Sequence, residues 1–176
     1  MQRERRKLNQ AGMTLVELIV VILILGILSG GAAVGISYVS RMNSTSAAEK
    51  LVSLLERARI YTISAEDTGG ADKVRLVLTK EDNTYYGTLM NGVTEVDKVS
   101  LGNGSLTIKV TKRVLNGEGT EVDDTRAVTN ASGGSYEISY KKANGAFTEK
   151  FKQIEISGSK TRYIQMVHTT GRAYLK

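Results

Sequence analysis

The sequence predicts an α+β fold, in which one long N-terminal helix precedes an antiparallel β domain. Residues 18–40 contain no charged side chain, and apolar residues recur at helical spacing over 51–61. From residue 73 onward the apolar residues alternate with a period of two, which is typical of strands. We therefore divide the chain into a basic leader at 1–12, an apolar half-helix at 13–40, an amphipathic half-helix at 41–66 and a β domain at 73–176.

The uncharged stretch at 18–40 has the length of a membrane span. At about 1.5 Å per residue a helix over it reaches roughly 34 Å, enough for a hydrocarbon core of about 30 Å. A cleavable secretory signal has a shorter apolar core. The leader is rich in Lys and Arg, so the positive-inside rule predicts a single-pass protein with a cytoplasmic N-terminus and an extracytoplasmic domain.

Glu17 lies inside this apolar zone, where an acidic residue near a helix centre costs about 2.5 to 3.5 kcal/mol. The sequence from Gly12 to Glu17 is GMTLVE, after a basic leader and before an apolar helix. It resembles the processing signal of type IV prepilins and pseudopilins. The resemblance implies the pilin fold, cleavage between Gly12 and Met13 by a prepilin peptidase, and N-methylation of Met13. It also gives Glu17 an assembly role, because its carboxylate can neutralise the new ammonium of Met13 in its own or a neighbouring subunit.

Many pilins carry a proline in the stem helix, whereas this chain has no proline. Four glycines occupy that region: Gly26, Gly30, Gly31 and Gly35. They favour either local melting of the helix or close packing against another helix. Both alternatives place this segment at a helix–helix interface.

The amphipathic half-helix has one apolar stripe, predicted at Leu51, Leu54, Leu55, Ala58 and Tyr61. Its polar face carries Glu49, Lys50, Ser53, Glu56 and Arg57. We expect one helix from Thr14 to about Glu66, ended by the sequence DTGG at 67–70. Its stripe is expected to cover one face of the antiparallel sheet.

Alternating apolar residues predict five strand segments and a last edge at 173–175. The segments are centred on Leu76, Ile108, Ile138, Ile154 and Met166. Turns are predicted at Asn91-Gly92, Asn144-Gly145 and Thr170-Gly171. Residues 115–134 are rich in Gly, Asp, Thr and Asn and predict a long exposed loop.

The β domain is similar to that of H-type minor pseudopilins more than to that of major subunits. The similarity rests on residues 56–59 (ERAR), a strand at 74–79 and Thr170-Gly171-Arg172. The absence of cysteine departs from the disulfide-closed C-terminal loop of many major pilins.

Other chemistries have little support. With no cysteine and one histidine, His168, the chain has no thiolate metal site and no multi-histidine site. Glu121, Asp123 and Asp124 are candidate calcium ligands, but their spacing fits no twelve-residue loop, and a solvated acidic loop is the expected alternative. We predict no metal, no cofactor, no catalytic residue and no enzymatic activity.

Half of the net charge of +6 belongs to the leader, which carries Arg3, Arg5, Arg6 and Lys7 against Glu4. The remaining basic residues near the C-terminus include Lys150, Lys152, Lys160, Arg162, Arg172 and Lys176. If they met at one end of the domain they would attract phosphates, but no base-stacking aromatic motif accompanies them. Nucleic acid is therefore an unlikely partner.

The resemblance implies a structural, minor subunit of a type IV pilus or type II secretion pseudopilus. Its implied partners are other pilin or pseudopilin subunits, the prepilin peptidase, the membrane and an inner-membrane assembly platform. Two alternatives stay open. One is a DNA-binding minor pilin of a competence system, and the other is a membrane-anchored surface domain that never assembles.

Overall fold

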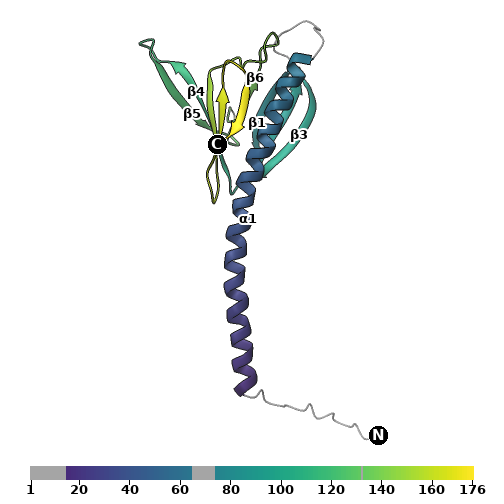
Figure 1. Ribbon diagram of the computed structural model, residues 1–176, viewed down its shortest axis with the longest axis vertical. Coiled ribbons are helices and arrows are strands. Elements are labelled where there is room, and N and C mark those ends of the chain that lie inside the picture. Colours follow the sequence, from purple (N-terminus) through teal and green to yellow (C-terminus); the bar gives the residue numbers. More distant parts are fainter. Residues whose placement is uncertain (1–14, 65–73, 132) are drawn as a thin grey trace, which may run out of the picture. The chain divides into compact units, whose positions relative to one another are not determined.

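The computed structural model describes residues 15–64, 74–131 and 133–176, and it leaves out the side chains of residues 27–42. It comprises two compact units, Met1–Tyr38 and Val39–Lys176. Helix α1 (Leu15–Ser64) is followed in the chain by a β domain (Figure 1). This order confirms the predicted α+β class. Thr14 and the predicted helix stop at 67–70 lie outside the described residues, and the four-part division of the chain stays a prediction.

The later part of α1 packs through one buried stripe, formed by Ala47, Ala48, Leu51, Leu54, Leu55 and Ala58. The prediction for Tyr61 was wrong, because 38% of this residue is exposed and Thr62 is buried instead. At 3.6 residues per turn, Thr62 lies four positions after Ala58 on the buried face, whereas Tyr61 falls to its side. The Thr62 hydroxyl donates to the carbonyl of Ala58 at 2.8 Å, which satisfies it inside the core.

Sheet A is antiparallel with the strand order β3-β2-β1-β6. Its strands are β1 (Val74–Glu81), β2 (Thr84–Asn91), β3 (Thr94–Asn103) and β6 (Tyr136–Ser139). The hairpin predicted at Asn91-Gly92 is present but shifted by one residue. Asn91 is paired with Thr94, so Gly92 and Val93 form the turn. Gly92 has a φ of 62°, which glycine adopts without steric cost.

Sheet B is antiparallel with the strand order β5-β4-β7-β8-β9. Its strands are β4 (Thr107–Leu115), β5 (Glu121–Ala127), β7 (Phe151–Ser157), β8 (Arg162–Val167) and β9 (Arg172–Leu175). The predicted turn at Thr170-Gly171 joins β8 to β9, and the predicted C-terminal edge strand is confirmed as β9.

The loop predicted at 115–134 was wrong in its central part, which is strand β5. Its backbone pairs with β4 from Glu121 to Ala127. Most of its residues are exposed, because β5 contributes no side chain to the apolar core. A strand exposed on both faces has no apolar alternation, so its polar sequence resembles that of a loop.

The two sheets share one apolar core with the later part of α1. The chain crosses from β6 to β7 through the predicted turn at Asn144-Gly145, and an isolated bridge pairs Tyr140 with Phe147 there. The Tyr140 hydroxyl donates to the carbonyl of Leu55 in α1 at 2.9 Å. Burial raises the pKa of Tyr140 far above its ordinary value, so this hydroxyl remains a donor. Tyr140 thus connects the crossing point to the buried stripe of the helix.

Candidate functional site

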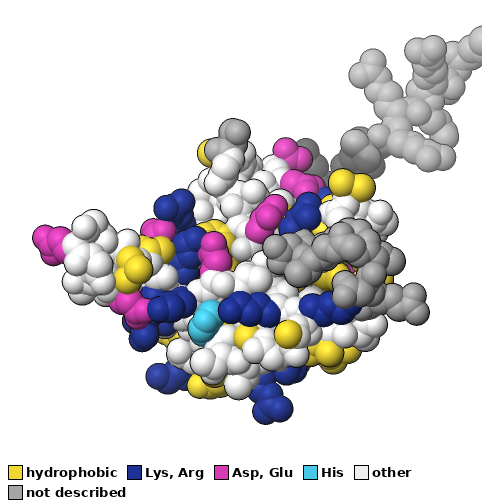
Figure 2. Space-filling model, turned by 90° about the horizontal axis from the view of Figure 1, so that it is seen from above, with side chains coloured by type: hydrophobic (Ala, Val, Ile, Leu, Met, Phe, Trp, Pro, Cys, Tyr) yellow, Lys and Arg dark blue, Asp and Glu magenta, His cyan; other side chains and the backbone are white. Residues whose placement is uncertain are grey.

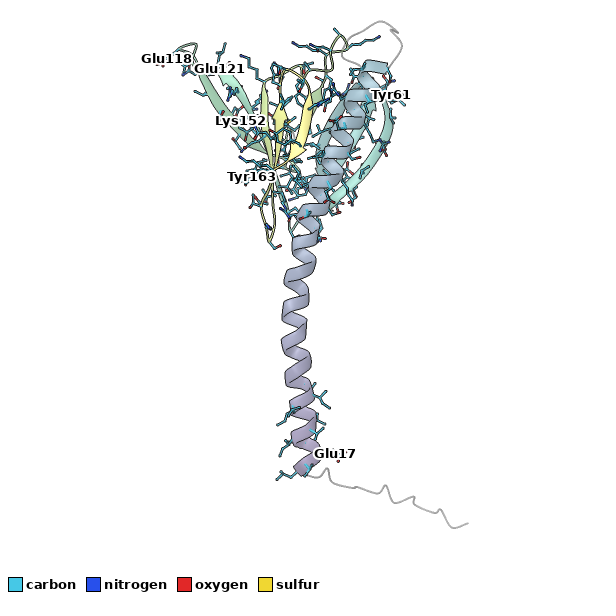
Figure 3. All side chains as sticks on the ribbon, viewed as in Figure 1. Glu17, Tyr61, Glu118, Glu121, Lys152 and Tyr163 are labelled. Atoms are coloured by element: carbon cyan, nitrogen blue, oxygen red, sulfur yellow. The ribbon has the colours of Figure 1, made fainter. Side chains whose placement is uncertain are left out.

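The candidate site begins at the first turn of α1, where Glu17 is the acidic residue. Unpaired backbone N–H groups at a helix N-terminus favour a nearby negative charge. The Glu17 side chain is exposed, as Figure 3 shows near the start of the helix. Gly12 and Met13, the predicted processing residues, lie outside the described residues.

Glu17 lies within an apolar surface. Every large apolar side chain from Leu15 to Leu25 is between 42% and 75% exposed. Glu17 is the only charged residue from 15 to 26. A helix that is apolar on all sides is normally covered by lipid or by other apolar helices. The described residues of its own unit do not bury this segment, so it requires contact with lipid or with another apolar helix.

A search of the described residues finds no helix with the length and apolar character required to cross a membrane. The membrane span predicted at 18–40 stays a prediction.

Residues 7–33 match a protein family described as the prokaryotic N-terminal methylation motif. The chain carries the type IV prepilin and pseudopilin signal. This signal supports a pilin-like or pseudopilin-like structural subunit, and it implies membrane anchoring through the N-terminal helix, processing by a prepilin peptidase and assembly with other pilin subunits. The match ends before the β domain and does not distinguish the H-type subclass. No curated protein and no solved structure matches the chain.

His168 lines an open groove of about 410 Å³ on sheet B, together with Arg113, Lys150, Lys152 and Tyr174. Figure 2 shows the histidine in cyan, with Lys and Arg side chains in dark blue on the same face. The histidine is half-buried, and its Nδ1 lies 2.8 Å from the carbonyl oxygen of Glu149. No hydrogen bond within the described ranges joins it to a serine or a carboxylate. The groove therefore lacks the arrangement of a nucleophile and a base.

The three candidate calcium ligands lie on β5, and each pairs with a cation. Glu121 pairs with Lys150, and this hydrogen bond lowers the pKa of the Glu121 carboxyl. Asp123 pairs with Lys152, and Asp124 lies 3.1 Å from Arg126. Among the residues that the structure describes, no group of acidic or histidine side chains has the arrangement of a metal site.

The basic residues near the C-terminus do not meet at one end of the domain. Arg172 is paired with Val167, at the end of β8 near Lys150 and Lys152. Arg162 is paired with Ile156 at the other end of β8. Lys176 is also at that end, because its backbone N–H donates to Tyr163. The set thus forms two groups, and Lys150 and Lys152 are already paired with carboxylates.

Tyr163 and Tyr174 are two exposed aromatic residues of sheet B that no predicted site contained; they are 39% and 51% exposed. Each alternates with a buried neighbour, Ile164 or Ala173, so period-two alternation places both tyrosines on the outer face of sheet B. That alternation was available in the sequence and would have identified them.

Proposed function

We propose that this chain is a minor subunit of a type IV pilus or a type II secretion pseudopilus. A prepilin peptidase cuts between Gly12 and Met13, and the new N-terminus is methylated. The N-terminal helix first holds the subunit in the membrane, with the leader in the cytoplasm, and then joins neighbouring stems with the help of an inner-membrane assembly platform. The role is structural, and no catalytic residue takes part.

One observation carries this proposal, namely that the methylation motif coincides with an exposed apolar helix interrupted by one carboxylate. The motif spans 7–33, and the apolar surface with Glu17 lies inside that range. Lipid satisfies an apolar surface, but it disfavours a carboxylate. Neighbouring stems satisfy both, because they bring apolar side chains and the ammonium of a processed N-terminus.

In this mechanism Glu17 sets the register between stems. Cleavage leaves a positive charge at Met13, inside the apolar zone, and the Glu17 carboxylate of the adjoining subunit neutralises it. Each charge alone in an apolar medium is costly, whereas the pair is much less so. A stem shifted along its neighbour by one or two residues leaves both charges unpaired, and this penalty selects one alignment.

The test compares Glu17→Gln with a matched control, Glu49→Gln, in cells that hold the complete assembly machinery. Glu49 is an exposed carboxylate of the same helix within the second unit. We expect both variants to be cleaved after Gly12, as intact mass shows. Glu17→Gln should enter sheared filaments at least tenfold less than wild type, and Glu49→Gln should enter normally. Normal incorporation of the cleaved Glu17→Gln protein would contradict the charge-pairing role.

The processing step has its own test. Gly12→Val fills the space that a protease needs around the backbone at the cut, so full-length chain beginning at Met1 should accumulate. A Met1 N-terminus on the wild-type chain, in the presence of active prepilin peptidase, would favour the anchored domain that never assembles. The DNA-binding alternative requires the basic residues to act together, and their separation along β8 does not favour it.

A further inference from the structure

One end of sheet B lies against the first described residues of the second unit. The Arg162 Nε donates to the Thr45 hydroxyl of α1 at 3.1 Å. A Cβ placed on Gly158, in the turn between β7 and β8, would lie 3.5 Å from the Cβ of Ser44. Figure 1 shows this turn in yellow-green beside α1, and Figure 3 labels Tyr163 at the same end. These contacts place the β7–β8 turn where the chain enters the domain.

This end carries positive charge that no carboxylate in the described part of the chain offsets. From residue 156 to residue 176 the sequence has no Asp or Glu. Lys160, Arg162 and Lys176 form no ion pair with any described residue. The nearest acidic residue in sequence, Glu155, is paired with Lys109 at 3.6 Å and accepts from the Ser157 hydroxyl. Lys160 and Lys176 are exposed and are therefore available to an external anion, whereas the half-buried Arg162 faces α1.

An exposed aromatic residue accompanies the cations. Tyr163 follows Arg162 in β8, points to the outer face and is 39% exposed. Tyrosine is enriched at membrane–water interfaces, because its ring is apolar and its hydroxyl is polar. Lys176, whose backbone N–H donates to the Tyr163 carbonyl, and Lys160 in the adjoining turn form with this tyrosine a surface suited to the headgroup layer of a membrane.

Chain connectivity keeps this end close in sequence to the apolar stretch. Thr45 is five residues after Ser40, a rise of about 7.5 Å along a helix. The polar layer on each side of a bilayer is about 5 to 7 Å thick. A stem whose apolar stretch ends in the hydrocarbon core at Ser40 therefore keeps Thr45, and the strand bonded to it, within reach of the headgroup layer.

We propose that Lys160, Tyr163 and Lys176 form a docking surface for anionic phospholipid headgroups. The surface holds the domain of the unassembled subunit against the membrane, and entry into a filament releases it. The inference rests on the proposed membrane anchoring of the stem. Headgroup phosphates attract the two lysines, and Tyr163 inserts between headgroups.

A tryptophan reporter tests the proposal, because the chain has no tryptophan of its own. Tyr163→Trp is made in the full chain and reconstituted into vesicles that contain brominated lipids, which quench tryptophan fluorescence on contact. The matched control is Tyr61→Trp. Tyr61 is 38% exposed, nearly the same as Tyr163. It lies on α1 about 24 Å beyond Thr45, so it is far from the proposed docking surface.

We expect quenching of the Tyr163→Trp reporter to be at least twofold stronger in vesicles with anionic lipids than in zwitterionic vesicles. Raising the salt to about 1 M, where the Debye length is about 3 Å, should remove the difference. The Tyr61→Trp reporter should show little quenching in either vesicle. Equal quenching of the two reporters, or no dependence on anionic lipid, would overturn the docking surface.

Charge reversal gives a second test with its own control. Lys160→Glu with Lys176→Glu, in the Tyr163→Trp background, should lower quenching to the zwitterionic level, whereas Lys141→Glu with Arg172→Glu should not change it. The control pair makes the same change of charge at exposed positions away from this end. A response to a single-stranded oligonucleotide without one to anionic vesicles would also overturn the lipid assignment. If the wild-type chain fails to float with vesicles of any composition, the membrane anchoring itself is wrong, and the proposed function fails with it.

Discussion

The two ends of α1 make opposite use of their apolar side chains. From Leu15 to Leu25 the helix exposes apolar residues on all sides, and its first turn carries Glu17. From Ala47 to Ala58 it has a single buried stripe, and its polar residues face outward. One helix thus contains a segment that the described residues of its own unit leave exposed and a segment that packs in the core of both sheets.

This difference separates stability from assembly. Substitutions in the buried stripe act on the folding of the β domain, because the stripe belongs to the same core as both sheets. Substitutions near Glu17 act on what the helix contacts after folding. The following predictions test whether the two segments are as independent as their burial implies.

The largest effect is expected for Leu55→Asp, which places a charge without a partner in the core. We expect a loss of about 4 kcal/mol or more in the free energy of unfolding, enough to abolish the cooperative thermal transition of the full chain in detergent. Ile60→Asp is the control in the same unit, because Ile60 is 59% exposed, and its cost should stay within about 0.5 kcal/mol.

Ile22→Asp makes the same change in the exposed apolar segment, so that its effect can be compared with that of Leu55→Asp in the core. It should leave the thermal transition of the β domain unchanged while reducing recovery of the chain with membranes. A shared loss of the transition in Ile22→Asp and Leu55→Asp would show that the two segments are not independent.

The next largest effect is expected for Gly171→Ala. Gly171 has a φ of 65°, and a Cβ there would lie 1.7 Å from the carbonyl oxygen of Gly145. Left-handed strain and this overlap together should cost about 3 kcal/mol, measured by denaturant unfolding. Gly92→Ala is the matched control, since its φ is 62° and a Cβ meets no atom within 4 Å. It should cost only the strain, about 1 kcal/mol, and equal costs would show that the overlap relaxes away.

A smaller, pH-dependent effect is expected for Tyr140→Phe, which removes the hydrogen bond to Leu55. At pH 7 the loss should be about 1 kcal/mol. Burial raises the pKa of Tyr140 in the folded state, whereas in the unfolded state it titrates near pH 10. The wild type therefore loses stability as the pH rises above about 10, because only the unfolded tyrosine ionises there. Tyr140→Phe lacks this contribution, so unfolding at pH 11 should show a smaller gap between the two proteins, and an unchanged gap would contradict the buried neutral hydroxyl.

The sequence predicted the features that depend on neighbouring residues, and it missed those that depend on contacts between distant segments. The helix, the stripe from Leu51 to Ala58 and the turn at Thr170-Gly171 follow from local periodicity and turn residues. The exposed edge strand β5 and the division into two sheets depend on pairing between distant segments, which leaves no local pattern. The separation of Arg162 from Arg172 likewise comes from the register of β7, β8 and β9.

The candidate site, unlike the sheet pairing, depends on a local pattern in the sequence. The signal at Gly12, Met13 and Glu17 is a short linear motif, so the sequence alone identifies it, and residues 7–33 match the methylation motif. The structure adds the exposed apolar surface around Glu17, which indicates a partner for this segment. It also adds the pairing of Lys176 with Tyr163, which depends on the folded domain.

The smallest effect tests whether polar contacts help the buried stripe to hold α1 on sheet A. Arg57 donates to the Asp97 carboxylate of β3 at 2.6 Å, and the two side chains are 55% and 27% exposed. An exposed ion pair of this kind contributes about 0.2 to 1 kcal/mol, and salt screens it. A double-mutant cycle of Arg57→Ala and Asp97→Ala should therefore give a coupling of about 0.5 kcal/mol that declines in 1 M salt. If the stripe holds the helix, even the double variant keeps a cooperative transition close to that of wild type. A coupling above about 2 kcal/mol would mean that the polar face, and not only the buried one, secures this half of the helix, and the contrast with the apolar segment would then rest on charge as well as on burial.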